Sequence, residues 1–294
     1  MEKVSEEVSE GVLLWNASLV LKAFLEDKAR AEFDGASVLE LGAGAGHLSL
    51  AIARMGARVT STEAKCSELG KDEDGRCKCW GCAQQLRRSL ARQLGSQHAP
   101  ALNAGEWVQV SSAAGAGSLH GAVRAVELEW GEAEAQQWAL REELAVPQSR
   151  PSIILMSEVI YNQSSDSLYD DEYHDTLVQT LLQLVRPGTI VYNVFVDRPF
   201  SFMFFAKIDE LPGKPFQVYL VSGGAHFRPR APMLAARAPP RAIHFFDTHQ
   251  LAVTFLPQVE PVKDGEFDNL GLTDDDAKVY IHRLVYAPAP DESQ

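Results

Sequence analysis

The chain has 294 residues, of which 46% are hydrophobic and 23% are charged. This composition is typical of a globular protein and excludes collagen-like, fibrous and wholly disordered chains. The 27 basic and 40 acidic residues give a net charge of −13. A surface this acidic repels phosphate backbones, so we do not expect nucleic acid as a partner.

No apolar stretch reaches the roughly 18 residues that a membrane-spanning helix requires. The longest one near the N-terminus, residues 12–25, is interrupted by Lys22. Residues 1–7 lack the basic-then-apolar order of a secretory signal. We therefore expect no membrane association, a cytoplasmic or nuclear location, and a monomer.

Helix-like and strand-like periodicity alternate between residues 12 and 221. This alternation predicts a mostly parallel sheet with helices on both faces. Apolar residues at helical spacing predict helices over 48–55 and 177–185, and a third helix that opens near Pro199 and continues to Ile208. The predicted strands are short and β-branched or aliphatic: 37–41, 58–62, 123–128, 152–156, 189–196, 216–221, 242–246 and 278–286.

Three stretches interrupt this alternation. Residues 66–80 are polar, residues 111–121 are small, and residues 223–241 are rich in Pro, Arg and Ala. We interpret residues 1–286 as one domain with these three inserts, and residues 287–294 as a disordered tail. The four arginines of the third insert form either a solvated loop or a contact for an acidic partner.

All four cysteines fall within 17 residues: Cys66, Cys77, Cys79 and Cys82. Such crowding argues against disulfides between distant segments, and four thiolates are the number that a structural zinc requires. Only Cys79 and Cys82 have the Cys-x-x-Cys spacing of a zinc ribbon. The irregular spacing favours an ordinary insertion with free thiols over the zinc site.

A predicted strand that ends in alternating glycines is the most informative segment. Residues 38–41 read Val-Leu-Glu-Leu, and residues 42–46 read Gly-Ala-Gly-Ala-Gly. A strand-to-helix turn without side chains lets the backbone approach a nucleotide-like ligand. A dinucleotide site would have its third glycine where this chain has His47. With Glu40 before it, the turn favours a ligand that has a cationic amino-acid end and no pyrophosphate.

The second predicted strand closes on Glu63, 21 residues beyond Gly42. A carboxylate at this position can accept both hydroxyls of a ribose. A glutamate at the end of a strand is also common on protein surfaces. Its distance from the glycine turn favours the binding role.

Four segments resemble motifs of the seven-β-strand S-adenosylmethionine-dependent methyltransferases, and in particular the family 16 protein-lysine methyltransferases of the methyltransferase-like 21 type. The glycine turn with Glu63 resembles motif I and its acidic partner. Residues 11–21, with Trp15, resemble the segment before motif I. Residues 128–131 resemble a Leu-x-Trp-Gly motif, and residues 153–161 resemble a strand that ends in an acidic-x-x-Tyr motif.

The resemblance implies a Rossmann-like α/β fold, with a seven-stranded sheet that is mostly parallel, an antiparallel last strand, and helices on both faces. It implies S-adenosylmethionine as cofactor and a lysine of a protein substrate as methyl acceptor. The implied catalytic residues are Glu158 and Tyr161. The implied cofactor-binding residues are Trp15, Glu40, Gly42, Ala43, Gly44, Gly46, Glu63, Trp130 and Ser157.

The chain departs from the family in two places. Asn16 stands where most members carry Asp, Glu or Pro, and Glu158 replaces the commoner Asp. Residues 157–162 also resemble the protein-histidine branch of the family. The alternatives are therefore a histidine or small-molecule acceptor, or a scaffold that binds the cofactor without catalysis.

The expected chemistry follows from the charge of the acceptor. A lysine side chain is protonated at neutral pH, and only the neutral amine attacks the methyl group. Glu158 is expected to bind and orient the ammonium, while Tyr161 shapes a narrow entry. Packing roles are the alternative for Trp15, Trp130 and Tyr161, because apolar surroundings usually place aromatic residues in a core.

Overall fold

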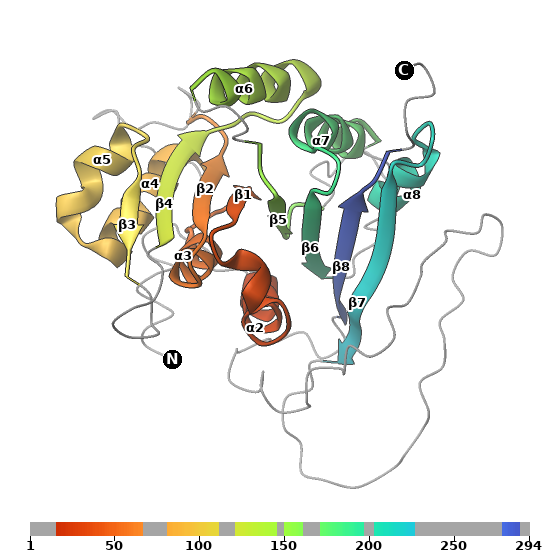
Figure 1. Cartoon of the computed structure of the whole chain (residues 1–294), viewed down its shortest axis with the longest axis horizontal. Helices are drawn as coiled ribbons and strands as arrows, with labels where there is room; N and C mark the ends of the chain where they lie inside the picture. The colour runs from red at the N-terminus through yellow and green to blue at the C-terminus, as the bar shows by residue number, and fades with distance from the viewer. Residues whose placement is uncertain are drawn as a thin grey trace, which may run out of the picture.

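The structure, a computed structural model, describes residues 16–66, 81–111, 121–145, 150–160, 171–196, 203–226 and 278–288. Within these ranges the chain forms an eight-stranded sheet in the order β3-β4-β2-β1-β5-β6-β8-β7. Helices cover both faces of this sheet (Figure 1). The strands are β1 Ser37–Leu41, β2 Arg58–Glu63, β3 Val108–Val110, β4 Gly121–Glu127, β5 Ile153–Ser157, β6 Ile190–Val196, β7 Phe216–His226 and β8 Lys278–Tyr286.

The centre of the sheet is parallel. Strand β1 pairs with β2 and β5, β2 pairs with β4, and β5 pairs with β6, all in parallel. The last strand, β8, runs antiparallel between β6 and β7. The predicted fold class, a mostly parallel Rossmann-like sheet with an antiparallel last strand, is confirmed.

The sheet has eight strands where the family resemblance implied seven. The additional strand, β3, pairs antiparallel with β4 at the edge of the sheet. It has only three residues, too few for strand periodicity to be recognised. Strand β4 begins at Gly121, the last residue of the second predicted insert. The predicted strand 242–246 lies outside the described residues.

Strand β7 continues to His226 and so occupies the first four positions of the insert predicted over 223–241. Two register shifts interrupt its pairing with β8, between Leu220 and Ser222 and between Gly223 and Ala225. Glycines inside a strand mark such irregularities. The same glycines caused the sequence prediction to end the strand too early.

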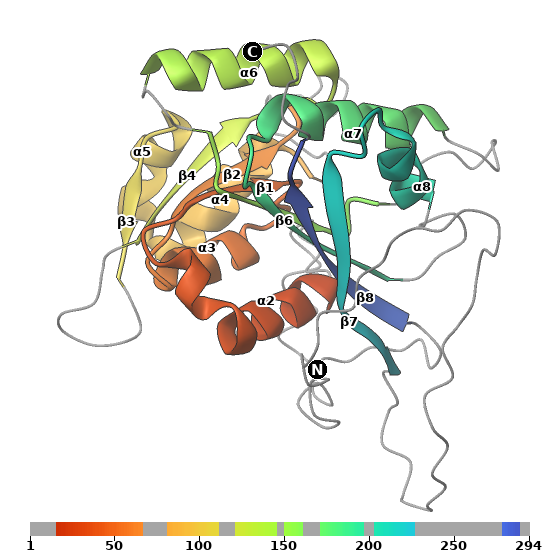
Figure 2. The same cartoon turned by 45° about the vertical axis from the view of Figure 1, so that its right-hand side comes forward.

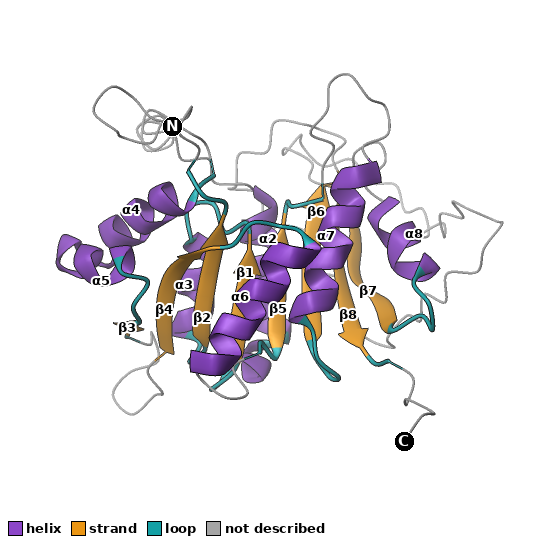
Figure 3. Ribbon diagram, turned by 90° about the horizontal axis from the view of Figure 1, so that it is seen from above, coloured by secondary structure: helices purple, strands orange, loops and turns teal. Residues whose placement is uncertain are grey.

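Two helical layers enclose the sheet (Figures 1 and 2). The helices α2 and α3 pack on one face, and α6, α7 and α8 pack on the other, as the view in Figure 3 also shows for α3 and α6. None of the described helices is long and apolar enough to cross a membrane. The α-helices are α2 Asn16–Lys28, α3 His47–Arg54, α4 Ala83–Leu94, α5 Ala99–Asn103, α6 Glu132–Ala145, α7 Asp171–Leu184 and α8 Met203–Glu210.

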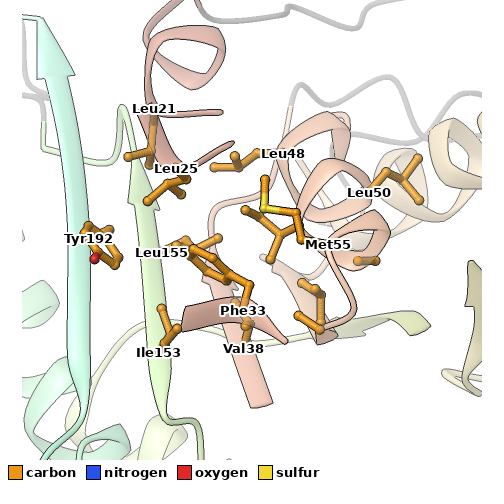
Figure 4. Close-up of a cluster of buried hydrophobic side chains, with 14 of the residues drawn as sticks. Leu21, Leu25, Phe33, Val38, Leu48, Leu50, Met55, Ile153, Leu155 and Tyr192 are labelled. Carbon is orange, nitrogen blue, oxygen red and sulfur yellow. The ribbon is translucent and has the colours of Figure 1, made fainter. Parts of the chain in front are cut away.

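Each face of the sheet has its own hydrophobic core. In the core beneath α2 and α3, Leu21 and Leu25 lie close to Leu155 of β5 (Figure 4). The neighbouring strand residues Ile154 and Met156 belong to the opposite core, beneath α7. Central parallel strands are buried on both faces in this way. The two cores therefore hold the carboxyl ends of β1, β2 and β5 at one common edge.

Candidate active site

The strand order reverses at β1. The chain continues from β1 to β2 on one side, whereas β5 lies on the other side of β1. The carboxyl ends of β1 and β5 are direct neighbours, because Leu41 pairs with Met156. Open α/β sheets bind their ligands at such a switch point, outside the carboxyl ends of the strands. The segments that follow β1, β2 and β5 therefore form the candidate site.

The turn after β1, residues 42–46 and here called the glycine turn, has a backbone that favours glycine. Gly42, Gly44 and Gly46 have φ values of 64°, 54° and 75°, in the left-handed region where a side chain is unfavourable. The Gly44 N–H donates to Glu63 Oε1 at 2.7 Å. The Ala43 N–H donates to the Thr62 carbonyl at 2.9 Å. These bonds join the glycine turn to the end of β2.

The three glycines serve different purposes. A Cβ at Gly44 would have no atom within 4 Å, so this side of the turn is open to a ligand. A Cβ at Gly46 would lie 2.6 Å from Leu90 Cδ2 and 2.9 Å from Leu86 Cδ1, both in α4. Gly46 is therefore required by the packing of α4, whereas Gly44 faces open space.

Glu63, which ends β2, is oriented by the backbone around it. One carboxylate oxygen accepts the Gly44 N–H, and the other accepts the Ala64 N–H at 3.3 Å. Burial raises the pKa of Glu63, and these two N–H groups oppose the rise. The carboxylate lies beside the glycine turn, where the ribose of a nucleotide-like cofactor is expected.

Glu40 lies behind the glycine turn and is only 2% exposed. Its carboxyl group is hydrogen-bonded to the Ser49 hydroxyl of α3, and Ser49 is 2.8 Å from the Ser61 hydroxyl of β2. Burial raises the pKa of Glu40 to about 8, and the charge of Glu63 adds to the rise. Glu40 therefore joins β1, α3 and β2. The contact with a cofactor amine that the sequence predicted for it stays a prediction.

The segment after β5, residues 158–160, carries the predicted catalytic acid. Among the described non-glycine residues, only Glu158 and Lys214 have positive φ values, 57° and 44°. The Glu158 N–H donates to the Val194 carbonyl of β6 at 2.9 Å, and 7% of the residue is exposed. Such strained backbone is concentrated at functional sites. The neighbouring Ser157 is 8% exposed, and its buried hydroxyl has no hydrogen-bond partner among the described residues.

Trp130 lies against the glycine turn, and its predicted role in cofactor binding stays a prediction. Its ring would be 3.5 Å from a Cβ at Gly42, and Val159 Cγ1 would be 2.8 Å from the same point. The Trp130 ring is 5.7 Å from that of Tyr173 in α7. The Tyr173 hydroxyl donates to the Val159 carbonyl at 2.7 Å.

Sequence reasoning missed Tyr173, which contacts both Trp130 and the segment after β5. It missed Ser49 and Ser61 as well. None of the three belongs to a motif, and each reaches the site only because α7, α3 and β2 pack around β1 and β5. The only sequence signal was Ser49, a polar residue between Leu48 and Leu50 in a predicted apolar helix.

The structure tests only part of the predicted site. Trp15, Tyr161, Cys77 and Cys79 lie outside the described residues. Cys66 and Cys82 are described and contact each other. The ranges that the structure describes contain no group of three or more side chains able to hold a metal ion. Burial raises the pKa of the Cys82 thiol, the N–H groups of Gln85 and Gln84 oppose the rise, and Cys66 adds to it.

The sheet order, the antiparallel β8 and the glycine turn at the switch point define a Rossmann-like methyltransferase fold. The chain belongs to the methyltransferase domain family, whose model matches residues 16–255. No curated protein matches the chain.

Solved structures of other methyltransferases resemble the chain at low similarity. The Thermus thermophilus 16S rRNA N2 G1207 methyltransferase (RsmC), in complex with AdoMet and guanosine, is 21% identical over 70% of this chain, with a TM-score of 0.37. This chain spans only 40% of the length of that protein. Magnesium protoporphyrin IX methyltransferase (ChlM) from Synechocystis PCC 6803, with bound SAH, is 12% identical over 92% of this chain and 82% of its own, with a TM-score of 0.37.

A third structure, precorrin-6y C5,15-methyltransferase from Geobacter metallireducens, is 10% identical over 92% of this chain and 87% of its own, with a TM-score of 0.39. The names of these proteins refer to RNA, a porphyrin and a precorrin. At these identities and TM-scores the likeness carries no conclusion about the acceptor.

Proposed function

We propose that this protein transfers a methyl group from S-adenosylmethionine to the side-chain amine of a lysine in a protein substrate. The observation that carries the proposal is the position of Glu158. This acidic residue follows β5 in a left-handed backbone conformation, next to the strand that carries the glycine turn. The resemblance of residues 128–131 and 153–161 to the family 16 protein-lysine methyltransferases supports the same acceptor.

The proposed cofactor-binding half of the site combines the backbone of the glycine turn, the Glu63 carboxylate and aromatic side chains. The open side of the turn at Gly44 admits the cofactor without a steric clash. Glu63 accepts the two ribose hydroxyls, since its carboxylate is already oriented by the Gly44 and Ala64 N–H groups. Trp130, beside Gly42, contacts the adenine. Trp15 is expected to add a further contact.

The sulfonium supplies an activated methyl group, so the protein's main task is alignment. The lone pair of the neutral lysine nitrogen forms a bond to the methyl carbon. The bond between carbon and sulfur breaks, its electron pair stays on sulfur, and S-adenosylhomocysteine leaves. The proton that the ammonium must lose passes to water.

Glu158 favours a cationic acceptor over a neutral one, because a carboxylate stabilises an ammonium through a charge-assisted hydrogen bond. The same attraction raises the lysine pKa, so Glu158 binds and orients the acceptor and is not a strong base. Tyr161 is assigned to the entry of the acceptor. The net charge of −13 supports a basic protein substrate and opposes a nucleic acid. We also propose that the protein acts as a monomer in the cytoplasm or nucleus.

The experiment is a labelling reaction. The full chain is incubated with methyl-labelled S-adenosylmethionine and a cytosolic extract, and the modified residue is identified by mass spectrometry. Label on lysine supports the proposal. Label on histidine assigns the protein to the histidine branch, and label on small molecules alone removes the protein acceptor. Cofactor binding without any transfer indicates an inactive scaffold.

A further inference from the structure

A buried threonine of α7 binds the segment that joins β4 to α6. The Thr180 hydroxyl accepts the Gly131 N–H at 2.8 Å and donates to the Thr176 carbonyl, also at 2.8 Å. Thr180 is 0% exposed, so water does not compete for these bonds. The hydroxyl thus uses its only proton within α7 and holds a backbone group 49 positions away in the sequence.

This bond acts on Trp130, because the Gly131 N–H belongs to the peptide unit that joins the two residues. Gly131 has a φ of 140° and, as a glycine, could adopt many other backbone conformations. Its carbonyl accepts the Ala135 N–H at 3.0 Å in the first turn of α6. Since a peptide unit is planar, Thr180 fixes the plane that follows Trp130 and so the direction of the indole.

The same helix contacts the indole itself. The Tyr173 ring of α7 is 5.7 Å from the Trp130 ring. Tyr173 and Thr180 are about two helical turns apart, on one face of α7. On the side of the glycine turn, Trp130 Cζ2 would be 3.5 Å from a Cβ at Gly42. Helix α7 therefore holds both the ring and the backbone of Trp130 next to the glycine turn.

We propose that Thr180 is a positioning residue for the cofactor, which aligns the Trp130 indole with the adenine by fixing the peptide unit between Trp130 and Gly131. This role rests on the proposed contact of Trp130 with the adenine and is independent of the methyl acceptor. Aromatic rings attract each other only in certain geometries, so a displaced indole binds adenine less tightly. Thr180 is fully buried and acts through Gly131 and Trp130.

The test is the affinity for S-adenosylhomocysteine, measured by calorimetric titration. Thr180→Val keeps the size of the side chain and removes the hydroxyl, so the Gly131 N–H loses its partner. We expect the affinity to fall about 5-fold, the effect of one lost hydrogen bond. Thr180→Ser keeps the hydroxyl and is expected to bind like the wild type. Equal affinity of Thr180→Val and the wild type overturns the positioning role.

Thr189→Val is the matched control, at the opposite edge of the sheet, directly before β6. Thr189 is 1% exposed, and its hydroxyl likewise donates to one carbonyl, that of Pro151, and accepts one N–H, that of Arg186. Urea unfolding should show similar losses of stability in Thr180→Val and Thr189→Val. Only Thr180→Val should lose affinity. An equal loss of affinity in the two variants reduces the role of Thr180 to stability.

Amide hydrogen exchange without ligand, followed by NMR, tests the hydrogen bond itself. The Gly131 N–H is expected to be protected in the wild type and to exchange several-fold faster in Thr180→Val. An unprotected Gly131 N–H in the wild type overturns the positioning role, even if Thr180→Val does not fold. A wild type that does not bind S-adenosylhomocysteine overturns the proposed cofactor site as well. Methyl transfer to an acceptor other than lysine leaves all these results unchanged.

Discussion

The two segments at the carboxyl edge of the sheet are held in different ways. The glycine turn after β1 is defined by backbone, through three positive φ values and two hydrogen bonds to the end of β2. The segment after β5 depends on individual long-range bonds, from the Glu158 N–H to β6 and from the Tyr173 hydroxyl to Val159. The glycine turn therefore depends mainly on left-handed backbone and one carboxylate, whereas the segment after β5 is held by one backbone bond to β6 and one tyrosine hydroxyl.

The largest effect is expected from Gly46→Val in the glycine turn. The new side chain would overlap Leu86 and Leu90 of α4 and adopt a left-handed backbone. Overpacking and the left-handed conformation together cost roughly 2–5 kcal/mol. Urea unfolding followed by circular dichroism measures this loss. A loss of stability no larger than that of Gly44→Val would contradict the packing role.

Gly44→Val tests the proposed role of the glycine turn in cofactor binding separately from its role in packing. Its Cβ has no neighbour within 4 Å, so we expect a modest loss of stability, about 1–2 kcal/mol, but no cofactor binding by calorimetric titration. Gly213→Val is the matched control, because Gly213 also has a positive φ and no atom near its Cβ. It should bind the cofactor normally. Normal binding by Gly44→Val would show that the turn is not the cofactor site.

Glu158→Gln tests the segment after β5. The variant keeps the shape of the side chain but removes its charge, so we expect methyl transfer to fall roughly 100-fold. Cofactor affinity should stay close to that of the wild type. Glu210→Gln, on the exposed end of α8, is the control for loss of one negative charge. Equal losses of transfer and of cofactor affinity would assign Glu158 to the cofactor side.

Tyr173→Phe removes the hydrogen bond to Val159 but keeps the ring beside Trp130. The loss of one hydrogen bond, about 1 kcal/mol, predicts a fall in kcat of roughly 5- to 10-fold with unchanged cofactor Kd. Tyr192→Phe removes a hydroxyl that binds Glu32 and borders the other core. That control should lower stability without lowering kcat. An unchanged kcat in Tyr173→Phe would exclude the positioning role.

A pH-dependent effect concerns Glu40, whose pKa burial raises from 4.5 to about 8. The folded protein holds a proton on this carboxyl that the unfolded chain releases at lower pH. Its stabilising contribution is complete below pH 4.5 and is lost as the pH rises towards 8. As the pH rises from 5 to 8, the unfolding free energy of the wild type should therefore fall relative to that of Glu40→Gln. A constant difference across this range would show that Glu40 is ionised when folded.

The sequence predicted the centre of the sheet well. Strands β1 and β8 have the predicted bounds, and β2 ends on Glu63 as expected. These segments are long enough, or apolar enough, for their pattern to be clear. Strand β3 was missed because three residues are too few to show strand periodicity. It is defined by its antiparallel pairing with β4, which forms only in the folded protein.

The candidate site was predictable where one segment carries the whole signal. The glycine turn and Glu158 each follow a strand that the sequence identifies, and Glu63 is the last residue of one. Tyr173 and Ser49 were not predictable, because their contacts with Val159 and Glu40 are formed only by packing of α7 and α3. A sequence motif indicates the backbone conformation that a residue requires, but not which side chain from a distant segment contacts that residue.

The sequence alone indicated a nucleotide-like ligand at the glycine turn, because the spacing of glycines after a buried strand restricts the backbone and therefore the ligand. Only the tertiary structure decided what each residue of that pattern does. It assigned Gly46 to packing and Gly44 to open space, and it brought Cys66 against Cys82. Such roles depend on atoms from different elements that meet only when the two helical layers close on the sheet.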